Sequence, residues 1–492
     1  MTVETQDTSD QPAAPPAGGS AMHKKALRGS AWTLGGIAAS RVIRLANNLI
    51  LTRLMDPGPI GVMNLANVLM QGLQMFSDIG IRPAIIQNKR GDDPDFLNTA
   101  WTMSVIRGFV LWALSCALAW PYAKFYNEPI LMTLIPVLGY TAVLAGMNST
   151  SLATANRHLA LGRLTMLELF AQIMNTVVVL IWAYFDPSPW ALVAGGMCNA
   201  ICYLVLSFVW LPGVKHRFRW DRDSARDLIR FGRWVFLSTA ITFLAVQCDP
   251  IVLGKIADVA LLAVYGIGKM WGTLPAEVFQ QLLTRVFFPI ISDMARSGKL
   301  ERARICELRT RLLLPVAIGT GSLFVVSDAA IRFMYRSEYW GAGPVFAITA
   351  IAAWFGIISY TYGVVLLSTG TLKSMTLSTA VKTIVFFALV FPAYQKWHLS
   401  GVALCVVAGE IIALGPILYG AYKLNVAMPL RELILSAVGA AFGLAMYGVQ
   451  TGVINATGSN LAGILANAAI TGAVCLGCVR SLFAYLKRSS GS

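Results

Sequence analysis

The chain has 492 residues, of which 56% are hydrophobic and only 13% are charged, and its mean hydropathy is +0.64. So few charges cannot cover the surface of a soluble protein, and apolar segments repeatedly reach the roughly 20 residues that span a bilayer. Composition therefore excludes a soluble enzyme. We expect an all-α polytopic membrane protein, because unpaired backbone amides cannot be left in hydrocarbon.

The chain is expected to open with a disordered cytoplasmic tail over residues 1–25, because residues 1–22 contain Glu4, Asp7 and Asp10, a Pro- and Gly-rich stretch at 15–19 and no apolar run. No small-residue cleavage site follows the basic residues Lys24, Lys25 and Arg28, so the first apolar segment is interpreted as a retained helix. Turn signals such as Asp56-Pro57-Gly58-Pro59 separate the apolar segments. About fourteen transmembrane helices are expected, near residues 30–51, 59–80, 99–120, 129–153, 164–185, 189–211, 231–254, 259–291, 312–328, 342–367, 374–394, 400–422, 430–451 and 461–485.

The basic residues give the orientation. Most of the 39 Lys and Arg residues fall in loops on the side of the N-terminus, with the largest clusters over 215–230 and 296–311. Positive loops stay in the cytoplasm, so both termini are predicted to be cytoplasmic. The net charge of +15 is explained by topology and by contact with anionic membrane lipids, and a nucleic-acid partner is not expected.

Residues 28–78 and 230–280 share a layout, with Trp32 matching Trp234 and Asp56 matching Asp258. In the first copy, polar residues recur at steps of 3 and 4 and so share one face of a helix: Asn64, Asn67, Gln71, Gln74 and Asp78. The matched positions are small or polar: Gly266, Lys269, Thr273, Ala276 and Gln280. Because six spans separate the copies, we expect two six-helix lobes related by a pseudo-two-fold axis along the membrane normal.

The expected organisation follows from this repeat. An N-terminal lobe covers 26–227, a C-terminal lobe covers 228–429, and the two lobes face each other across a cavity. Two additional transmembrane helices and a cytoplasmic C-terminus occupy 430–492.

Cations in the first span suggest what the cavity holds. Arg41, Arg44 and Asn48 recur at steps of 3 and 4, and each arginine facing lipid would cost about 2.5–3.5 kcal/mol. An arginine fork grips phosphate with two parallel hydrogen bonds. The sequence therefore favours an anion-binding cavity wall, and the alternative is internal ion pairing, for instance with Asp78 or Asp249.

Few carboxylates lie within the predicted spans. Asp78, Asp249 and Glu277 are the candidates for carrying a coupling proton or sodium ion, with Glu168 and Glu410 as further possibilities. The alternative is that each of them pairs with a neighbouring base.

Other chemistries lack their sequence patterns. The histidines have no ligand-like spacing and there is no GxxxxGK[ST] loop, so we expect no metal, no cofactor and no intrinsic ATPase. A membrane glycosyltransferase or polymerase would need an acidic catalytic loop. The acidic run Asp92-Asp93-Pro94-Asp95 lies in a short loop and is interpreted as a solvated turn.

The segment FSDIGIRPAIIQNKRGDDPDFLNTAW, from Phe76 to Trp101, closely resembles the stretch after the second span of Wzx-type polysaccharide flippases, which belong to the multidrug/oligosaccharidyl-lipid/polysaccharide superfamily. The opening at 26–32, the turn at 53–57 and the motifs at 253–255 and 264–265 resemble that family too, and the resemblance covers about 26–490.

The resemblance implies a flippase that moves undecaprenyl-pyrophosphate-linked oligosaccharide from the cytoplasmic to the periplasmic leaflet of a bacterial inner membrane, for lipopolysaccharide or exopolysaccharide synthesis. Arg41, Arg44 and Lys269 would hold the diphosphate, and Trp271 would stack on a sugar. The expected sugar-binding residues are polar: Asn48, Asn64, Asn67, Gln71, Gln74 and Thr273. A polymerase and a chain-length regulator are further expected partners. The alternatives are a multidrug cation antiporter of the same superfamily and a lipid II flippase.

Overall fold

The structure is a computed structural model that describes part of the chain, in which helices are the only regular elements. The described residues are 19–77, 80–88, 90–158, 160–211, 216–222, 226, 242–288, 291–292, 302–369, 371 and 373–489. Within them, nine helices are long and apolar enough to cross a membrane, and a bent pair of helices makes a tenth. The helical membrane class is therefore confirmed, and the total of about fourteen helices remains a prediction.

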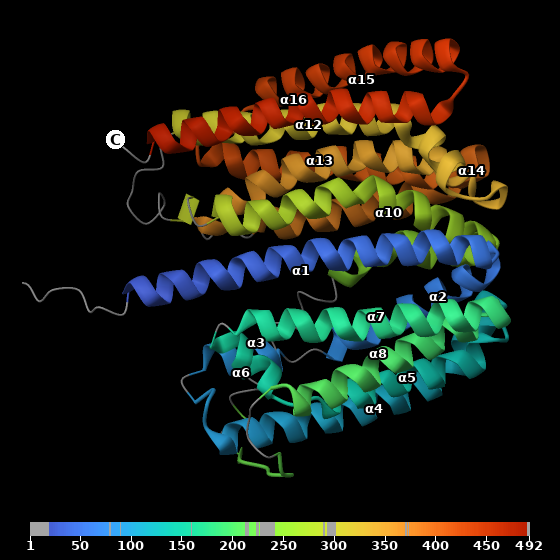
Figure 1. Ribbon diagram of the computed structural model, residues 1–492, viewed down its shortest axis with the longest axis vertical. Helices are drawn as coiled ribbons and strands as arrows, with labels where there is room; N and C mark the ends of the chain where they lie inside the picture. The colour runs from blue at the N-terminus through green and yellow to red at the C-terminus, as the bar shows by residue number, and fades with distance from the viewer. Residues whose placement is uncertain are drawn as a thin grey trace, which may run out of the picture.

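The long helices lie side by side in two groups (Figure 1), with α1 (Gly19–Leu54) between them. On one side lie α2 (Pro57–Ser77), α3 (Ile81–Gln87), α4 (Pro94–Tyr126), α5 (Leu131–Met147), α6 (Ser151–Arg157), α7 (Leu161–Phe185) and α8 (Pro189–Val209). On the other side lie α10 (Val259–Leu282), α12 (Arg302–Met334), α13 (Ala342–Ser368), α14 (Lys373–Lys423), α15 (Pro429–Thr457) and α16 (Asn460–Ser489). A helical segment at 242–256 precedes α10, and a π-helical turn, η1 (Leu283–Phe287), follows it.

Some predicted boundaries are wrong. α1 begins at Gly19, inside the expected disordered tail, because Ala, Met, Lys and Leu at 21–27 favour helix. The span expected over 129–153 divides into α5 and α6, which meet at 57°. The polar residues Asn148, Ser149 and Thr150 sit at that break, and Asn148 leaves the helical conformation with ψ 144°.

The helix α14 contains two of the predicted spans, 374–394 and 400–422. Its path breaks at His398, whose φ of 49° and ψ of −131° are not helical. The two arms lie against each other near the break, since a Cβ on Gly401 would come within 2.1 Å of the Ala393 carbonyl oxygen. The break therefore acts as a hairpin between two antiparallel arms.

The starts of two helices fall at matched positions of the predicted internal repeat. α2 begins at Pro57 and α10 begins at Val259, which is the matched position in the second copy. Halfway along, a Cβ on Gly266 would lie 3.2 Å from Nδ2 of Asn64, so two matched positions touch each other. A two-fold axis between the copies would produce such a contact, and the two-fold relation itself remains a prediction.

The two groups of helices pack closely where α2 and α10 begin. A Cβ on Gly61 would come within 1.9 Å of the Val259 carbonyl oxygen, so only glycine permits this approach. Nearby, the Tyr339 hydroxyl donates to the Met55 carbonyl at 3.0 Å, and the Tyr126 hydroxyl donates to the Ile251 carbonyl at 3.2 Å. One hydrophobic cluster continues from α2 through α10 into α13 and α14. This end of the molecule is closed by apolar packing.

We expect Gly61→Ala to force α2 and α10 apart and to destabilise the closed arrangement by about 1–3 kcal/mol, as overpacking does. The midpoint of thermal unfolding in detergent measures the effect. Gly58→Ala on the same helix is the matched control, since a Cβ there meets nothing within 4 Å. Equal midpoints for the two variants would contradict the close approach.

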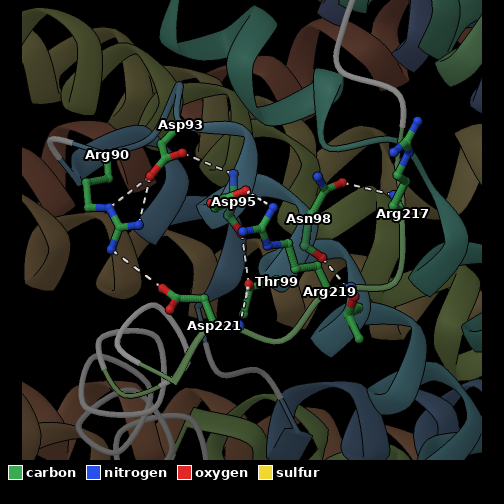
Figure 2. A network of polar contacts seen from close by, with 9 residues as sticks. Arg90, Asp93, Asp95, Asn98, Thr99, Arg217, Arg219 and Asp221 are labelled. Carbon is green, nitrogen blue, oxygen red and sulfur yellow. Dashed lines mark hydrogen bonds and ion pairs between the residues drawn. The ribbon is translucent and has the colours of Figure 1, made fainter.

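At the opposite end, a short segment at 216–222 binds along the start of α4 (Figure 2). The backbone amide of Arg217 donates to Asn98 Oδ1 at 3.0 Å, that of Arg219 to Thr102 Oγ1 at 3.1 Å, and that of Asp221 to Thr99 Oγ1 at 3.1 Å. We call residues 216–222 the strap. Side chains of α4 thus accept hydrogen bonds from the strap backbone, as the backbone of a neighbouring strand would in a sheet.

Ion pairs and an imidazole fasten the strap further. Arg219 pairs with Asp95 at 2.6 Å, and a hydrogen bond from Arg90 holds the pKa of Asp93, the N-cap of α4, below its usual value. The His216 ring stacks on Trp101 with centroids 5.4 Å apart and accepts from the Thr150 amide at 3.2 Å. Burial lowers the pKa of His216, which keeps the accepting nitrogen unprotonated.

Removing the side-chain acceptors should release the strap. In Asn98→Ala combined with Thr102→Ala, we expect the amides of Arg217 and Arg219 to exchange with deuterium at least about ten-fold faster, because each loses its acceptor. Hydrogen exchange of a peptide covering the strap measures this. Ser104→Ala is the control, since its hydroxyl donates to the Ala100 carbonyl of the same helix at 2.9 Å. Unchanged exchange would show that other contacts hold the segment.

Candidate functional site

The predicted cavity cation Arg41, on α1, lies beside a carboxylate of the second helix group. Arg41 Nη1 is 2.6 Å from Glu277 Oε2 on α10, and the two side chains are 30% and 44% exposed. They line a cavity of about 390 Å³ together with Gln280, Thr284 and Tyr360. An arginine and a carboxylate thus meet across the boundary between α1 and α10.

A second cavity of about 220 Å³ adjoins the first, since Glu277 and Gln280 line both. Here Lys269 Nζ lies 2.5 Å from Asp249 Oδ2, and the Tyr265 hydroxyl donates to the same oxygen at 2.9 Å. The Asp249 side chain is only 3% exposed, and these two donors compensate its burial.

The second cavity is lined by another ion pair, the third described in this region. Lys382, on the first arm of α14, contacts Glu410 on the second arm. The 28 residues that separate them in sequence are spanned by the hairpin at His398. Three cations and three carboxylates therefore surround the two adjoining cavities. We call these six residues the paired-charge site: Arg41, Asp249, Lys269, Glu277, Lys382 and Glu410.

Arg44 lies in a different place from Arg41. It lines a polar cavity of about 340 Å³ between α1, α7 and α8 with Ser40, Asn47 and Glu168. The charges of Arg44 and Arg82 both act on Glu168. Three residues turn a helix by about 300°, so Arg41 and Arg44 differ by about 60° around α1. With this difference, the two side chains point to opposite helix groups. The structure therefore does not bring the two predicted arginines into one cavity.

The predicted sugar-binding residues Asn48 and Trp271 are joined by a residue that sequence reasoning missed. The Trp271 indole donates to the Tyr335 hydroxyl at 2.8 Å, and that hydroxyl donates to Asn48 Oδ1 at 2.7 Å. The chain of hydrogen bonds links α1, α10 and the end of α12. Trp271 still packs its ring 6.4 Å from Phe346, so it is partly buried as well as bonded.

The polar residues of α2 do not all face the same surroundings. Gln71 accepts a hydrogen bond from Gln247, and Asn64 lies beside Gly266, so both face the second helix group. Asn67 and Gln74 are exposed. None of these four residues lines the cavities described above, whereas Thr273 on α10 does. Asn64 and Gln71 therefore lie against the second helix group without forming a wall of these cavities.

The coupling candidates also differ in placement. Asp249 and Glu277 lie in the paired-charge site, while Asp78 falls outside the described residues. Glu410 was a further coupling candidate from the sequence, whereas Lys382 and Tyr265 were absent from the predicted site residues. One signal could have paired Lys382 with Glu410: each is a single charge in an apolar segment, and the segments are consecutive.

The described contacts leave each site cation beside a carboxylate, so the cavity walls are charge-compensated. An anion that binds there competes with these carboxylates for the cations. Among the described residues, no cluster of three or more His, Cys, Asp or Glu side chains is placed to hold a metal ion.

Comparison with known proteins places these features in context. A family described as "Polysaccharide biosynthesis protein" matches residues 50–344. The lipopolysaccharide biosynthesis protein WzxC of Escherichia coli (strain K12) is 21% identical over 399 residues, which are 80% of each chain. The teichuronic acid biosynthesis protein TuaB of Bacillus subtilis (strain 168) is 22% identical over 363 residues, covering 70% of this chain and 72% of TuaB.

Solved structures share the fold. The lipid II flippase MurJ in an inward closed conformation has a TM-score of 0.69 at 14% identity, covering 94% of this chain and 99% of its own. An outward-facing multidrug resistance MATE transporter of the MOP superfamily has a TM-score of 0.54 at 14% identity, covering 82% of this chain and 96% of its own. At these identities the likeness concerns the fold alone.

Proposed function

Because the chain belongs to the polysaccharide biosynthesis protein family, we propose that it is a flippase for an undecaprenyl-pyrophosphate-linked oligosaccharide. The substrate moves from the cytoplasmic to the periplasmic leaflet of a bacterial inner membrane and supplies lipopolysaccharide or exopolysaccharide synthesis. The protein acts as a transporter and not as an enzyme. A polymerase and a chain-length regulator would take over the translocated unit.

The observation that carries the proposal is the paired-charge site. Arg41, Lys269 and Lys382 lie around two adjoining cavities, one between α1 and α10 and one within the second helix group, where an anionic head group can meet several cations at once. Charge-assisted hydrogen bonds to phosphate contribute about 1.5–3 kcal/mol each, so two or three of them give useful affinity. The polar residues of α2 are suited to sugar hydroxyls.

The mechanism that fits this arrangement is alternating access between two lobes, 26–227 and 228–429, with the helices of 430–492 attached to the second. The matched starts of α2 and α10, and the contact of Asn64 with Gly266, support a two-fold relation between the lobes. Closed packing at Gly61 and Val259 leaves substrate entry to the opposite, cytoplasmic end. A proton or sodium ion at Asp249 or Glu277 is the proposed means of resetting the cycle.

The experiment places the purified protein in liposomes with a lipid-pyrophosphate oligosaccharide and measures sugar exposure with a membrane-impermeant lectin. Exposure above that of empty liposomes is the expected result, and it should be lost in Arg41→Ala combined with Arg44→Ala. Uptake of an organic cation without sugar exposure would instead support the drug antiporter. Exposure restricted to lipid II would support the peptidoglycan-precursor flippase.

A further inference from the structure

The ion pair of Lys382 and Glu410 has features of an exchangeable contact. Its two residues come from the two arms of one hairpin, and their side chains are 29% and 15% exposed. Both line the same cavity as Lys269, so two ammonium groups share one enclosed space. Asp249 lies close enough for its charge to act on Lys382 as well.

Other charged and titratable groups face this pair from the elements packed around the cavity. The segment 242–256 contributes Cys248 and Asp249, and α10 contributes Tyr265, Lys269 and Glu277. The second arm of α14 adds Cys405, and the lining residues of α13 are uncharged. Arg41 of α1 is engaged with Glu277 at the border of the cavity. The formal charge of the site is therefore balanced before any ligand arrives.

The two carboxylates differ in what each would keep after losing its lysine. Asp249 retains the hydrogen bond from the Tyr265 hydroxyl. Glu410 lies near the backbone of Gly356, where a Cβ would come within 3.6 Å of its carboxyl carbon, and glycine offers no side-chain donor. A buried carboxylate without a cation is more stable when it is protonated.

We propose that Lys382 is a further diphosphate-binding residue, and that diphosphate binding releases it from Glu410, which then takes up one proton from solvent. The proposal rests on the proposed function, because it concerns how the same site accepts an anionic head group. No covalent bond changes: the ammonium exchanges a carboxylate for a phosphate oxygen, and the carboxylate gains a proton. Anion binding and proton uptake are thereby linked.

The sign of the pH dependence follows from this exchange. Because the bound state holds one more proton at Glu410, diphosphate affinity rises as the pH falls. Where Glu410 is ionised without ligand and protonated with it, one linked proton changes the affinity about ten-fold per pH unit.

The test uses the full-length protein in lipid nanodiscs and titrates inorganic pyrophosphate by calorimetry, in two buffers of different ionisation enthalpy. Glu410→Gln removes the competing carboxylate. It should bind pyrophosphate about ten-fold tighter than wild type at pH 8, with about one proton fewer taken up and a flatter pH dependence. Protons that pyrophosphate itself gains or loses on binding are the same for wild type and variant, so they cancel in the difference in proton uptake. Glu307→Gln is the matched control, since Glu307 pairs with Arg311 on α12 at 2.8 Å.

A purely structural ion pair predicts the opposite pattern. Folded Glu410→Gln with wild-type affinity and wild-type proton uptake, or with weaker binding, would overturn the proposal, as would absence of pyrophosphate binding to wild type. If Glu410→Gln does not fold, the uncharged double variant Lys382→Gln/Glu410→Gln serves instead, and it should bind more weakly with no linked proton. Sugar exposure in liposomes is measured separately, so a flippase without this linkage is distinguished from a protein that is no flippase.

Discussion

Arg41→Ala is expected to slow translocation of a lipid-linked oligosaccharide by about ten- to a hundred-fold. The reason is the loss of a charge-assisted hydrogen bond to the diphosphate, which contributes about 1.5–3 kcal/mol. Arg41→Lys keeps the charge and should retain much of the activity, although it loses the planar fork. The rate of lectin accessibility in proteoliposomes, normalised to the amount of protein, measures the effect.

A matched double variant separates this role from simple pairing with Glu277. Glu277 lies 2.6 Å from Arg41, so Arg41→Ala also leaves a carboxylate without its partner. Removing both members of a pair relieves that penalty. In Arg41→Ala combined with Glu277→Gln we expect translocation to remain slow, because the cation for the diphosphate is still missing. Recovery to the wild-type rate would show that Arg41 only neutralises Glu277.

Arg309→Leu should destabilise the fold by about 3–5 kcal/mol, as expected when one member of a buried ion pair is removed. Arg309 is only 2% exposed and donates to Glu432 at 3.0 Å and to Thr361 at 2.9 Å. Its guanidinium also lies 3.4 Å from the ring centroid of Tyr362. These contacts join α12, α13 and α15, so their loss leaves Glu432 buried without a cation.

The midpoint of thermal unfolding in detergent checks this expectation. Arg311→Leu is the control on the same helix, because Arg311 and its partner Glu307 are 33% and 45% exposed and such pairs contribute little. A smaller shift for Arg311→Leu is the expected result. Comparable shifts for the two variants would mean that burial of Arg309 does not decide its contribution.

The sequence predicted the class and the family, because both depend on features that are local in the chain. Apolar segments of spanning length are a property of composition, and the long helices of the described residues confirm them. The family resemblance rested on the stretch from Phe76 to Trp101, and the matching family over residues 50–344 confirms it. In the structure this stretch includes α3 and the start of α4, to which the strap binds.

The site was harder to predict, because side-chain partners depend on packing between distant helices. The sequence placed Arg41 and Arg44 on one face, yet 60° of difference around α1 suffices to direct them into separate cavities. It named Asp249 as a possible partner of the arginines, and the structure pairs Asp249 with Lys269. Lys382 and Glu410 meet only because α14 folds back at His398. No proline or glycine stands at that position to predict the break.

The central claim is that the paired-charge site recognises the diphosphate of a lipid-linked oligosaccharide. The most direct measurement compares two lipids that carry the same oligosaccharide, one through a diphosphate and one through an uncharged linkage, in proteoliposomes with a membrane-impermeant lectin. We predict protein-dependent exposure of the diphosphate-linked sugar alone, and its slowing by about ten- to a hundred-fold in Arg41→Ala. Equal exposure of the uncharged glycolipid, or exposure that Arg41→Ala leaves unchanged, would contradict the claim.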